Sequence, residues 1–387
     1  MESFFSSDFT LGILGGGQLG KMLLYETRKF DVRTLVLDKS KEAPGKYGAN
    51  VFIQGDLMDY DTVLEFGRKV NLLTIEIEAV NVRALQQLEK EGITVYPSSQ
   101  TLLNIQDKGV QKKFYAEKNL PTAAFTVYRN GKEAKAAVLN GESQLPLVWK
   151  SCTGGYDGKG VRILKEESQL DTLPDTECLL EEKVAYTHEL AVIVCRSAKG
   201  EVVVYPVVEM EFHPEANQVE YVLCPARIPE GVAEKAKQIA RNVSEAFGHV
   251  GLLAIELFLT KDGDILINEI APRPHNSGHF SIEASYTNQF EQHLRAILGL
   301  PLGSTETKAN SVMVNVVGEE GYTGEVIYQN IAQILELPGV TPHIYGKKET
   351  RPFRKMGHVT IINEDMNKAR KIAEVVKQTL RVHSKTR

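Results

Sequence analysis

Residues 268–278 carry the side chains with the clearest capacity for chemistry. The segment reads Asn-Glu-Ile-Ala-Pro-Arg-Pro-His-Asn-Ser-Gly and follows the apolar run 265–267, which is typical of a strand. Glu269 lies at the end of this strand, and Arg273 and His275 follow it in a loop that two prolines restrict. Glu256 interrupts an earlier apolar strand. Two carboxylates on successive strands beside a cationic loop indicate metal-assisted chemistry on a phosphorylated substrate.

The carboxylates of Glu256 and Glu269 need partners if they are buried. A carboxylate within an apolar strand is costly unless it is paired or bound to a metal, and paired acids before phosphate-binding cations are typical of Mg²⁺ sites. A salt bridge to a core arginine is the alternative. The sequence has no zinc-ligand spacing, because its nine histidines are scattered, and it has no G-x-S-x-G motif.

Two glycine-rich segments indicate phosphate binding. Residues 15–20, Gly-Gly-Gly-Gln-Leu-Gly, match G-x-G-x-x-G between an expected strand and an expected helix, and Asp38 ends the next strand. Backbone amides at such a helix start can hold a phosphate; NAD, a phosphorylated sugar and a purely structural turn all remain open. The second segment, 151–160, suits a lid over nucleotide phosphates. It lacks the Walker A ending, and a surface hairpin is the alternative.

Further polar residues stand at expected element ends. Lys108 opens an expected helix and Lys150 ends an expected strand, both on the side expected to face a nucleotide. Residues 181–184, Glu-Glu-Lys-Val, offer carboxylate and backbone acceptors for an adenine amine and a ribose. Glu76 and Glu78 alternate at a strand end, where doubly wound sheets place ligand contacts.

Composition bounds the class of protein. With 387 residues, 42% of them hydrophobic and 25% charged, the chain is expected to form two or three soluble domains. A net charge of −5 gives no broad footprint for nucleic acid; the basic segment 345–358 is either a solvated face or an anion clamp. We expect no membrane span and no signal peptide. Four cysteines without CxxC spacing indicate reduced thiols in a cytoplasmic enzyme.

The order of expected elements predicts an α/β region followed by an α+β region. Strands and helices alternate over the first hundred residues, which favours a parallel sheet with crossover helices. After a boundary at Leu120-Pro121, short strands surround glycine-rich turns, and 190–195 with 202–208 form an expected hairpin. A long helix, 231–247, precedes the two carboxylate strands, and a helix over 366–380 closes the chain.

Together these motifs resemble the ATP-grasp enzymes, and most closely the 5-(carboxyamino)imidazole ribonucleotide synthetases of purine biosynthesis. The resemblance spans nearly the whole chain and rests on six segments: 15–20, 76–78, 154–160, 268–279, 345–347 and 351–358. It implies an ATP-grasp fold with an N-terminal Rossmann-like parallel-sheet domain and a C-terminal mixed α+β portion. The implied domains are a substrate-binding domain over 1–105, a lid domain over 106–184, and a catalytic domain with a substrate clamp over 185–387.

The resemblance also implies a reaction and its residues. ATP phosphorylates bicarbonate, and the resulting carboxyphosphate delivers its carbon to the amine of 5-aminoimidazole ribonucleotide. Glu256 and Glu269 would hold Mg²⁺ or Mn²⁺. The implied ATP contacts are Lys108, Lys150, Glu181, Val184, Glu189 and Asn268. The implied catalytic residues are Arg273, His275, Asp157 and Lys159, and the implied ribonucleotide contacts are Gln18, Leu19, Glu78, Tyr156, Lys347 and Arg354.

Two positions depart from the family pattern, and other functions are open. Phe353 stands where the family usually has glycine, and Ala79 where it has a polar residue. The alternatives are formate-dependent glycinamide ribonucleotide transformylation, an NAD-dependent oxidoreductase and a non-catalytic nucleotide-binding regulator. The resemblance implies a homodimer, and we expect a separate mutase to consume the product. The expected partners are the small-molecule substrates, with no nucleic acid and no membrane.

Overall fold

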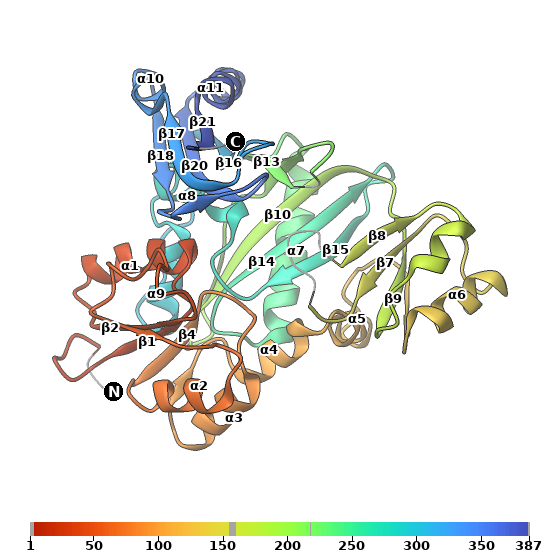
Figure 1. Cartoon of the computed structure of the whole chain (residues 1–387), viewed down its shortest axis with the longest axis horizontal. Coiled ribbons are helices and arrows are strands. Elements are labelled where there is room, and N and C mark those ends of the chain that lie inside the picture. The colour runs from red at the N-terminus through yellow and green to blue at the C-terminus, as the bar shows by residue number, and fades with distance from the viewer. Residues whose placement is uncertain (1–3, 155–159, 217, 386–387) are drawn as a thin grey trace.

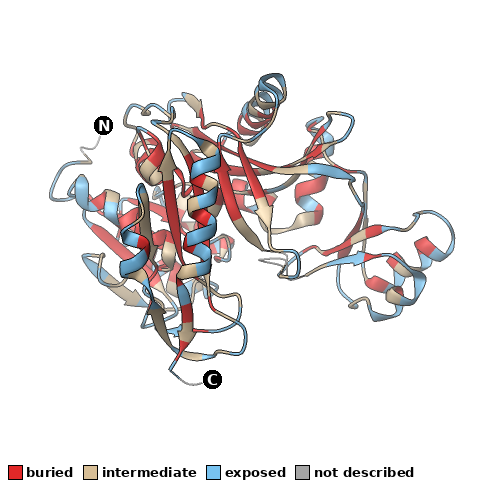
Figure 2. Ribbon diagram, turned by 90° about the horizontal axis from the view of Figure 1, so that it is seen from above, coloured by how far each residue is buried: buried red, intermediate tan, exposed pale blue. Residues whose placement is uncertain are grey.

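The computed structural model describes residues 4–154, 160–216 and 218–385. Its sheets lie in separate regions, with a lobe around β7–β9 projecting from the central sheet (Figure 1). Buried residues concentrate in the central strands and in the helix faces that pack on them (Figure 2). The predicted residues Tyr156, Asp157 and Lys159 lie outside the described part of the chain. In the described part, no helix is long and apolar enough to cross a membrane.

The N-terminal region is a parallel sheet with the strand order β3-β2-β1-β4-β5, which confirms the predicted Rossmann-like domain. The central strands are buried along their whole length because helices cover both faces. Asp59 and Asn81 cap the helices α2 and α3 through their side chains. The elements are β1 Leu11–Leu14, α1 Gln18–Lys29, β2 Thr34–Asp38, β3 Val51–Gln54, α2 Tyr60–Gly67, β4 Leu72–Ile75, α3 Val82–Lys90, β5 Thr94–Val95 and α4 Ser99–Gln106.

The projecting lobe is an antiparallel sheet in the order β6-β9-β7-β8, with α6 packed on it. Its small core is centred on Trp149, which is almost fully buried. The glycine-rich loop joins β7 to β8, as the sequence predicts. The elements are α5 Lys108–Glu117, β6 Phe125–Tyr128, α6 Gly131–Leu139, β7 Leu147–Ser151, β8 Val161–Leu164 and β9 Cys178–Glu182.

The central sheet runs in the order β15-β14-β10-β12-β13-β16-β20-β18, with β11 on β10. The predicted hairpin is confirmed between β10 and β11, but the expected strand 202–208 is wrong, since β11 ends at Val204 and β12 begins at Val208. The elements are β10 Tyr186–Arg196, β11 Val202–Val204, β12 Val208–Phe212, β13 Val219–Cys224, α7 Glu230–Phe247, β14 Gly251–Thr260, β15 Ile265–Ala271, α8 Ser281–Ala284 and α9 Gln289–Ile297.

The C-terminal region extends the same sheet and covers it with the closing helix. α11 packs on β16 and β20 around a core that includes Val314 and Val359. A small sheet, β19-β17-β21, lies beside it. The elements are β16 Asn310–Val317, β17 Gly324–Gln329, α10 Ile331–Leu335, β18 Val340–Ile344, β19 Glu349–Thr350, β20 Lys355–Asn363, α11 Met366–Thr379 and β21 Arg381–Ser384.

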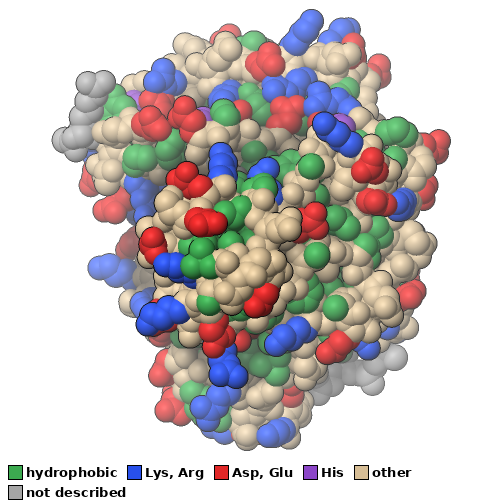
Figure 3. Space-filling model, turned by 90° about the vertical axis from the view of Figure 1, so that its right-hand side faces the viewer, with side chains coloured by type: hydrophobic (Ala, Val, Ile, Leu, Met, Phe, Trp, Pro, Cys, Tyr) green, Lys and Arg blue, Asp and Glu red, His purple; other side chains and the backbone are tan. Residues whose placement is uncertain are grey.

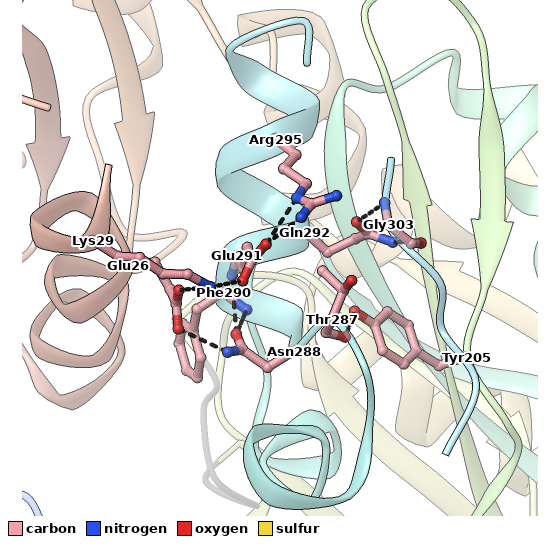
Figure 4. Close-up of polar contacts among 10 residues, drawn as sticks. All are labelled: Glu26, Lys29, Tyr205, Thr287, Asn288, Phe290, Glu291, Gln292, Arg295 and Gly303. Atoms are coloured by element: carbon pink, nitrogen blue, oxygen red, sulfur yellow. Dashed lines mark hydrogen bonds and ion pairs between the residues drawn. The ribbon is translucent and has the colours of Figure 1, made fainter. Parts of the chain in front are cut away.

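A polar joint fastens the N-terminal domain to the central region through α1 and α9 (Figure 4). Glu291 on α9 accepts from Lys29 of α1 and from Arg295 one turn along α9. Asn288 caps α9 and donates to Glu26 of α1 at 2.7 Å. Burial opposes ionisation of Glu291, but the two cations outweigh it and lower its pKa. The joint fixes the helix that follows the first glycine loop.

Charges of both signs are interspersed over the face drawn in Figure 3, with hydrophobic side chains scattered between them. On this face neither Lys and Arg nor Asp and Glu gather into a single large patch.

Candidate active site

A cleft of about 650 Å³ lies between the N-terminal domain, the lobe and the central sheet. All three regions and strand β20 contribute to its lining. Eight of the predicted site residues line it: Gln18, Leu19, Glu78, Lys108, Glu256, Glu269, Arg273 and His275. The structure therefore brings the expected metal and bicarbonate contacts together with three expected ribonucleotide contacts, whereas Lys347 and Arg354 are not among the lining residues.

The carboxylates of Glu256 and Glu269 face each other across the antiparallel strands β14 and β15. A β-bulge follows this pair: Leu257 lies opposite Ile267, so Asn268 is the extra residue of β15. Such a bulge re-aims the side chains around it. The side chain of Asn268 accepts a hydrogen bond from Lys150 at 3.1 Å. The bulge thus turns Asn268 toward the lobe while Glu269 stays opposite Glu256.

The two carboxylates hold opposite protonation tendencies. Burial, with the nearby charges of Glu269 and Glu189, raises the pKa of Glu256 to about 8. Burial also opposes ionisation of Glu269, but Lys108, Lys150 and Arg273 outweigh it and lower its pKa. Lys108 bonds Glu269 directly. Lys108 thus favours the ionised form of Glu269, while burial favours the protonated form of Glu256.

The donor set of the carboxylate pair fits Mg²⁺. This ion takes oxygen ligands and is held in nucleotide enzymes by one or two carboxylates, with phosphates and water completing the shell. Within the described residues, no cluster of three or more His, Cys, Asp and Glu could hold a metal by itself. Burial and the charge of Glu269 raise the pKa of Glu256, and a divalent cation between the two carboxylates would relieve their repulsion.

Residues 272–279, which we call the catalytic loop, present a guanidinium and an uncharged imidazole to the cleft. Nε of Arg273 lies 2.9 Å from Oε2 of Glu78, so the loop is tied to the N-terminal domain. Burial, with Arg273 and Lys355, lowers the pKa of His275 to about 3. Nδ1 of His275 accepts from the backbone N–H of Ser277 at 3.3 Å. Nε2 therefore carries the proton and is a donor, 3.8 Å from Oε1 of Glu256.

The amide of Gln289 fixes the shape of the catalytic loop. Its oxygen accepts from the backbone N–H of His275 and its nitrogen donates to the carbonyl of His275, both at 2.8 Å. The same nitrogen lies 2.9 Å from Nδ1 of His279. Gln289 is fully buried at the start of α9. Sequence reasoning missed this residue, because nothing local distinguishes a buried glutamine from an exposed one.

The first glycine loop is occupied by the protein's own carboxylates. Asp38 accepts from the backbone N–H of Gly16 at 2.7 Å, and Glu76 accepts from that of Leu19 at 3.1 Å. A Cβ on Gly17 would lie 2.4 Å from the Glu76 carboxylate. The amides of Gly16 and Leu19 are therefore taken by carboxylates, and phosphate binding by the rest of this loop stays a prediction. Gln18 and Leu19 still line the cleft.

The expected nucleotide side contains a buried ion cluster. Glu181 on β9 pairs with Lys150 at 2.6 Å and with Lys112 of α5. Burial, opposed by Glu181, lowers the pKa of Lys112 to about 8. Sequence reasoning missed Lys112, although its spacing of one helical turn from Lys108 is a usable signal. Lys150, Glu181, Val184, Glu189 and Asn268 as nucleotide contacts stay predictions.

The basic C-terminal segment meets the cleft through Lys355, a residue that sequence reasoning missed. Lys355 lines the cleft at the start of β20. Lys347 donates to the backbone carbonyl of Lys355 at 2.6 Å, and Arg354 to that of Glu349 at 2.6 Å. Phe353 has a φ of +59°, a conformation that glycine adopts readily. The positive φ accounts for the glycine that the family usually has at this position, and Phe353 adopts it at a conformational cost; no consequence follows from the structure for Ala79.

Domain families match the chain along most of its length. The ATP-grasp domain matches residues 113–290, the ribonucleotide synthetase preATP-grasp domain matches 9–106, and the phosphoribosylaminoimidazole carboxylase C-terminal domain matches 311–372. With the carboxylate pair facing the lobe, these matches define an ATP-grasp protein.

Relatives identify the family within that class. N5-carboxyaminoimidazole ribonucleotide synthase of Bacillus subtilis (strain 168) is 37% identical over 358 residues, which are 92% of this chain and 91% of the relative. This chain belongs to the N5-carboxyaminoimidazole ribonucleotide synthase family. Phosphoribosylaminoimidazole carboxylase of Candida albicans is also 37% identical, but the chain spans only 65% of its length.

Solved structures agree with this assignment. N5-carboxyaminoimidazole ribonucleotide synthetase from Thermotoga maritima has a TM-score of 0.88 at 42% identity, over 97% of this chain and 100% of that one. The synthase from Aspergillus clavatus, solved with ADP and 5-aminoimidazole ribonucleotide, has a TM-score of 0.88 at 31% identity, over 96% and 98% of the two chains. The fold and the family predicted from the sequence are confirmed.

We expect Gly278→Ala to destabilise the catalytic loop. A Cβ at position 278 would lie 2.4 Å from the Gln289 oxygen, and Gln289 cannot move without breaking its bonds to His275. The free energy of unfolding in chemical denaturation should fall by about 1–3 kcal/mol. Gly231→Ala is the control, since open space surrounds Gly231 at the start of α7. Equal stabilities for the two variants would contradict the assigned role of Gln289.

We expect Glu256→Gln to stabilise the ligand-free protein at alkaline pH. The pKa of Glu256 is about 8 when folded and near its ordinary value when unfolded, so wild-type stability falls as pH rises from about 4.5 to 8. The glutamine variant lacks this loss. Its Tm should exceed that of wild type by roughly 2–4 °C or more at pH 8 and by less at pH 5.

The control for this comparison is Glu142→Gln, which changes an exposed carboxylate and should keep the wild-type profile. The measurement is thermal unfolding without Mg²⁺ or nucleotide. Identical pH profiles for wild type and Glu256→Gln would show that the buried proton is wrongly assigned.

Proposed function

We propose that this chain catalyses the ATP- and bicarbonate-dependent carboxylation of 5-aminoimidazole ribonucleotide on its exocyclic amine, a step of purine biosynthesis. The observation that carries the proposal is the Glu256–Glu269 pair facing Arg273 and His275 in one cleft. Such an arrangement places a nucleotide–metal site beside an anion site. Membership of the synthase family supports the assignment of substrates.

The reaction has two stages. A bicarbonate oxygen attacks the γ-phosphorus of ATP, ADP leaves, and carboxyphosphate forms. Cleavage of its carbon–oxygen bond gives phosphate and CO₂, and the amine nitrogen attacks the CO₂ carbon and loses a proton to give the carbamate. The relative from Aspergillus clavatus, solved with ADP and the aminoimidazole ribonucleotide, supports a site that holds both molecules.

The nucleotide would lie between the lobe and the central sheet. Lys108 and Lys150 would neutralise its phosphates, and Glu181, Val184, Glu189 and Asn268 are its further expected contacts. Glu256 and Glu269 would hold Mg²⁺, or Mn²⁺, which would offset phosphate charge during transfer. Lys108 already donates to Glu269, and its ammonium could donate to the ATP phosphates at the same time.

Arg273 and His275 would bind bicarbonate and then carboxyphosphate. The guanidinium is a planar donor that matches a carboxylate or a phosphate, and Glu78 holds it in place. The neutral His275 carries its proton on Nε2 and lines the cleft, so it can donate a hydrogen bond to an anion bound there. Donors fixed before the reaction stabilise developing negative charge with little reorganisation.

The ribonucleotide would occupy the N-terminal side of the cleft. Gln18, Leu19 and Glu78 line that side, and Tyr156, Asp157 and Lys159 remain expected contacts in the loop between β7 and β8. Lys347 and Arg354 are the expected phosphate clamp. Lys355 adds a cation of the same segment that lines the cleft itself.

The wider setting is also part of the proposal. We propose that the protein acts in the cytoplasm as a homodimer and that a separate mutase consumes its carbamate. The cysteines support a reducing compartment, because all four are buried as free thiols. Sedimentation at assay concentration tests the dimer.

The proposed reaction predicts that 5-aminoimidazole ribonucleotide stimulates ADP release in the presence of bicarbonate and becomes carboxylated itself. The measurement is coupled detection of ADP, together with incorporation of labelled bicarbonate into the ribonucleotide. Glycinamide ribonucleotide with formate is the control substrate pair and should give no stimulation. Absence of a response to the aminoimidazole ribonucleotide would overturn the proposal.

We expect Arg273→Lys to lower kcat/KM by about 100-fold or more, because lysine keeps the charge but loses the two-point donor geometry and the bond to Glu78. The measurement is steady-state ADP release with bicarbonate varied. Arg241→Lys, at an exposed position of α7, is the control and should match wild type. Activity of Arg273→Lys within twofold of wild type would remove Arg273 from the bicarbonate site.

A further inference from the structure

Three imidazole rings form a stacked column between the catalytic loop and the C-terminal strands. His279 of the loop stacks on His358 of β20 with ring centroids 4.6 Å apart, and His358 stacks on His343 of β18 at 4.5 Å. The ring planes differ by 26° and 14°. His343 and His358 are direct partners in the β18–β20 register. We propose that this histidine column, together with Tyr345, is a positioning element that fixes residues 345–355, here called the clamp segment, to the catalytic loop.

Both ends of the histidine column are anchored by hydrogen bonds. Gln289 donates to Nδ1 of His279 at 2.9 Å while it holds the backbone of His275. At the other end, Nε2 of His343 lies 2.7 Å from Oε1 of Glu283 on α8. The column therefore cannot slide relative to the catalytic loop without breaking one of these bonds.

Tyr345 connects the column to the cation-bearing clamp segment. Its hydroxyl lies 3.0 Å from Nδ1 of His358, and both side chains are buried. The ammonium of Lys347 lies 5.6 Å from the centroid of the Tyr345 ring and bonds the carbonyl of Lys355. Lys355 lines the cleft. A shift of Tyr345 would thus displace both the lysine expected to bind the substrate phosphate and the lysine beside the catalytic loop.

The contacts suit positioning and do not suit proton transfer. Stacked rings turn their faces toward each other, so their N–H groups do not form a hydrogen-bonded chain along the column. Burial, with the neighbouring histidines, lowers the pKa of His358 well below its ordinary value, which keeps the central ring neutral. Within the described residues, Nε2 of His358 is buried without a hydrogen-bond partner. A hydrocarbon ring at this position would pack without the free-energy cost of that unpaired group.

The inference rests on the proposed function, and a pair of tyrosine variants tests it. Tyr345→Phe removes only the bond to His358, and Tyr328→Phe removes a bond of similar length from another tyrosine to the same strand, where Tyr328 donates to the carbonyl of Met356 at 3.1 Å. We expect Tyr345→Phe to raise the KM for 5-aminoimidazole ribonucleotide about fivefold, the equivalent of one hydrogen bond, with the KM for ATP within twofold of wild type. Tyr328→Phe should leave both values unchanged.

A second set of variants separates the hydrogen bond from the stack. His358→Phe keeps a ring in the column without the bond, and His358→Asn keeps a polar partner for Tyr345 without the ring. We expect both to raise the KM for the ribonucleotide, and we expect Tyr345→Phe combined with His358→Phe to be no worse than His358→Phe alone, because the two changes break one connection.

Hydrogen exchange supplies a readout that needs no substrate. Tyr345→Phe should speed exchange in residues 275–279 as well as in 345–358, whereas Tyr328→Phe should leave 275–279 unchanged. Equal effects of the two tyrosine variants, or a parallel rise in the KM for ATP, would overturn the inference. Wild-type protein that does not respond to the ribonucleotide would instead overturn the proposed function, and the exchange result would still decide whether the two segments are coupled.

Discussion

The site depends on one buried amide, that of Gln289, which bonds the backbone of His275 on both its donor and its acceptor side. Two prolines limit the backbone of the catalytic loop but do not place it, so its position depends on such side-chain contacts. Gln289 opens α9, and the same helix carries His293, whose Nε2 lies 2.9 Å from the hydroxyl of Thr74 on β4. One helix therefore sets the loop and the N-terminal domain relative to each other. The joint between Glu291 and α1 keeps that helix in place.

Charge in the ligand-free cleft is balanced by protonation as well as by ion pairs. Lys108 favours the ionised form of Glu269, burial favours the protonated form of Glu256, and burial beside Arg273 favours the neutral form of His275. Burial drives both neutral states, since removal from water disfavours whichever form is charged. Binding of a divalent cation and a polyphosphate would change the pKa values of all three residues together. Metal binding as proposed would therefore be coupled to loss of the Glu256 proton, a consequence of placing two acids opposite each other in adjacent strands.

The fold could be predicted from the sequence where local pattern determines structure, and the site only in part. The alternation of apolar strands with amphipathic helices specifies the N-terminal parallel sheet. Glu256 can be recognised because it interrupts an apolar strand, and Glu269 because it follows one. The sequence does not show that these two residues lie opposite each other, because that depends on the register of β14 with β15 and on the bulge at Asn268. Glu76 shows the limit most clearly. Its strand end was expected to face a ligand, and Glu76 does line the cleft, but its carboxylate also accepts from the backbone N–H of Leu19, a contact between distant segments that no local pattern encodes.

The catalytic loop is held from two sides, and this fixes its place in a cleft built from several sheets. On one side Gln289 and α9 connect the loop to the N-terminal domain, where Glu78 meets Arg273. On the other side the histidine column connects His279 to β18 and β20, which carry Lys355 into the cleft. A loop fastened at a single end would let Arg273 and His275 move together relative to the carboxylate pair. Fastening at both ends removes that freedom, so packing sets the distance of Arg273 and His275 from the carboxylate pair of Glu256 and Glu269.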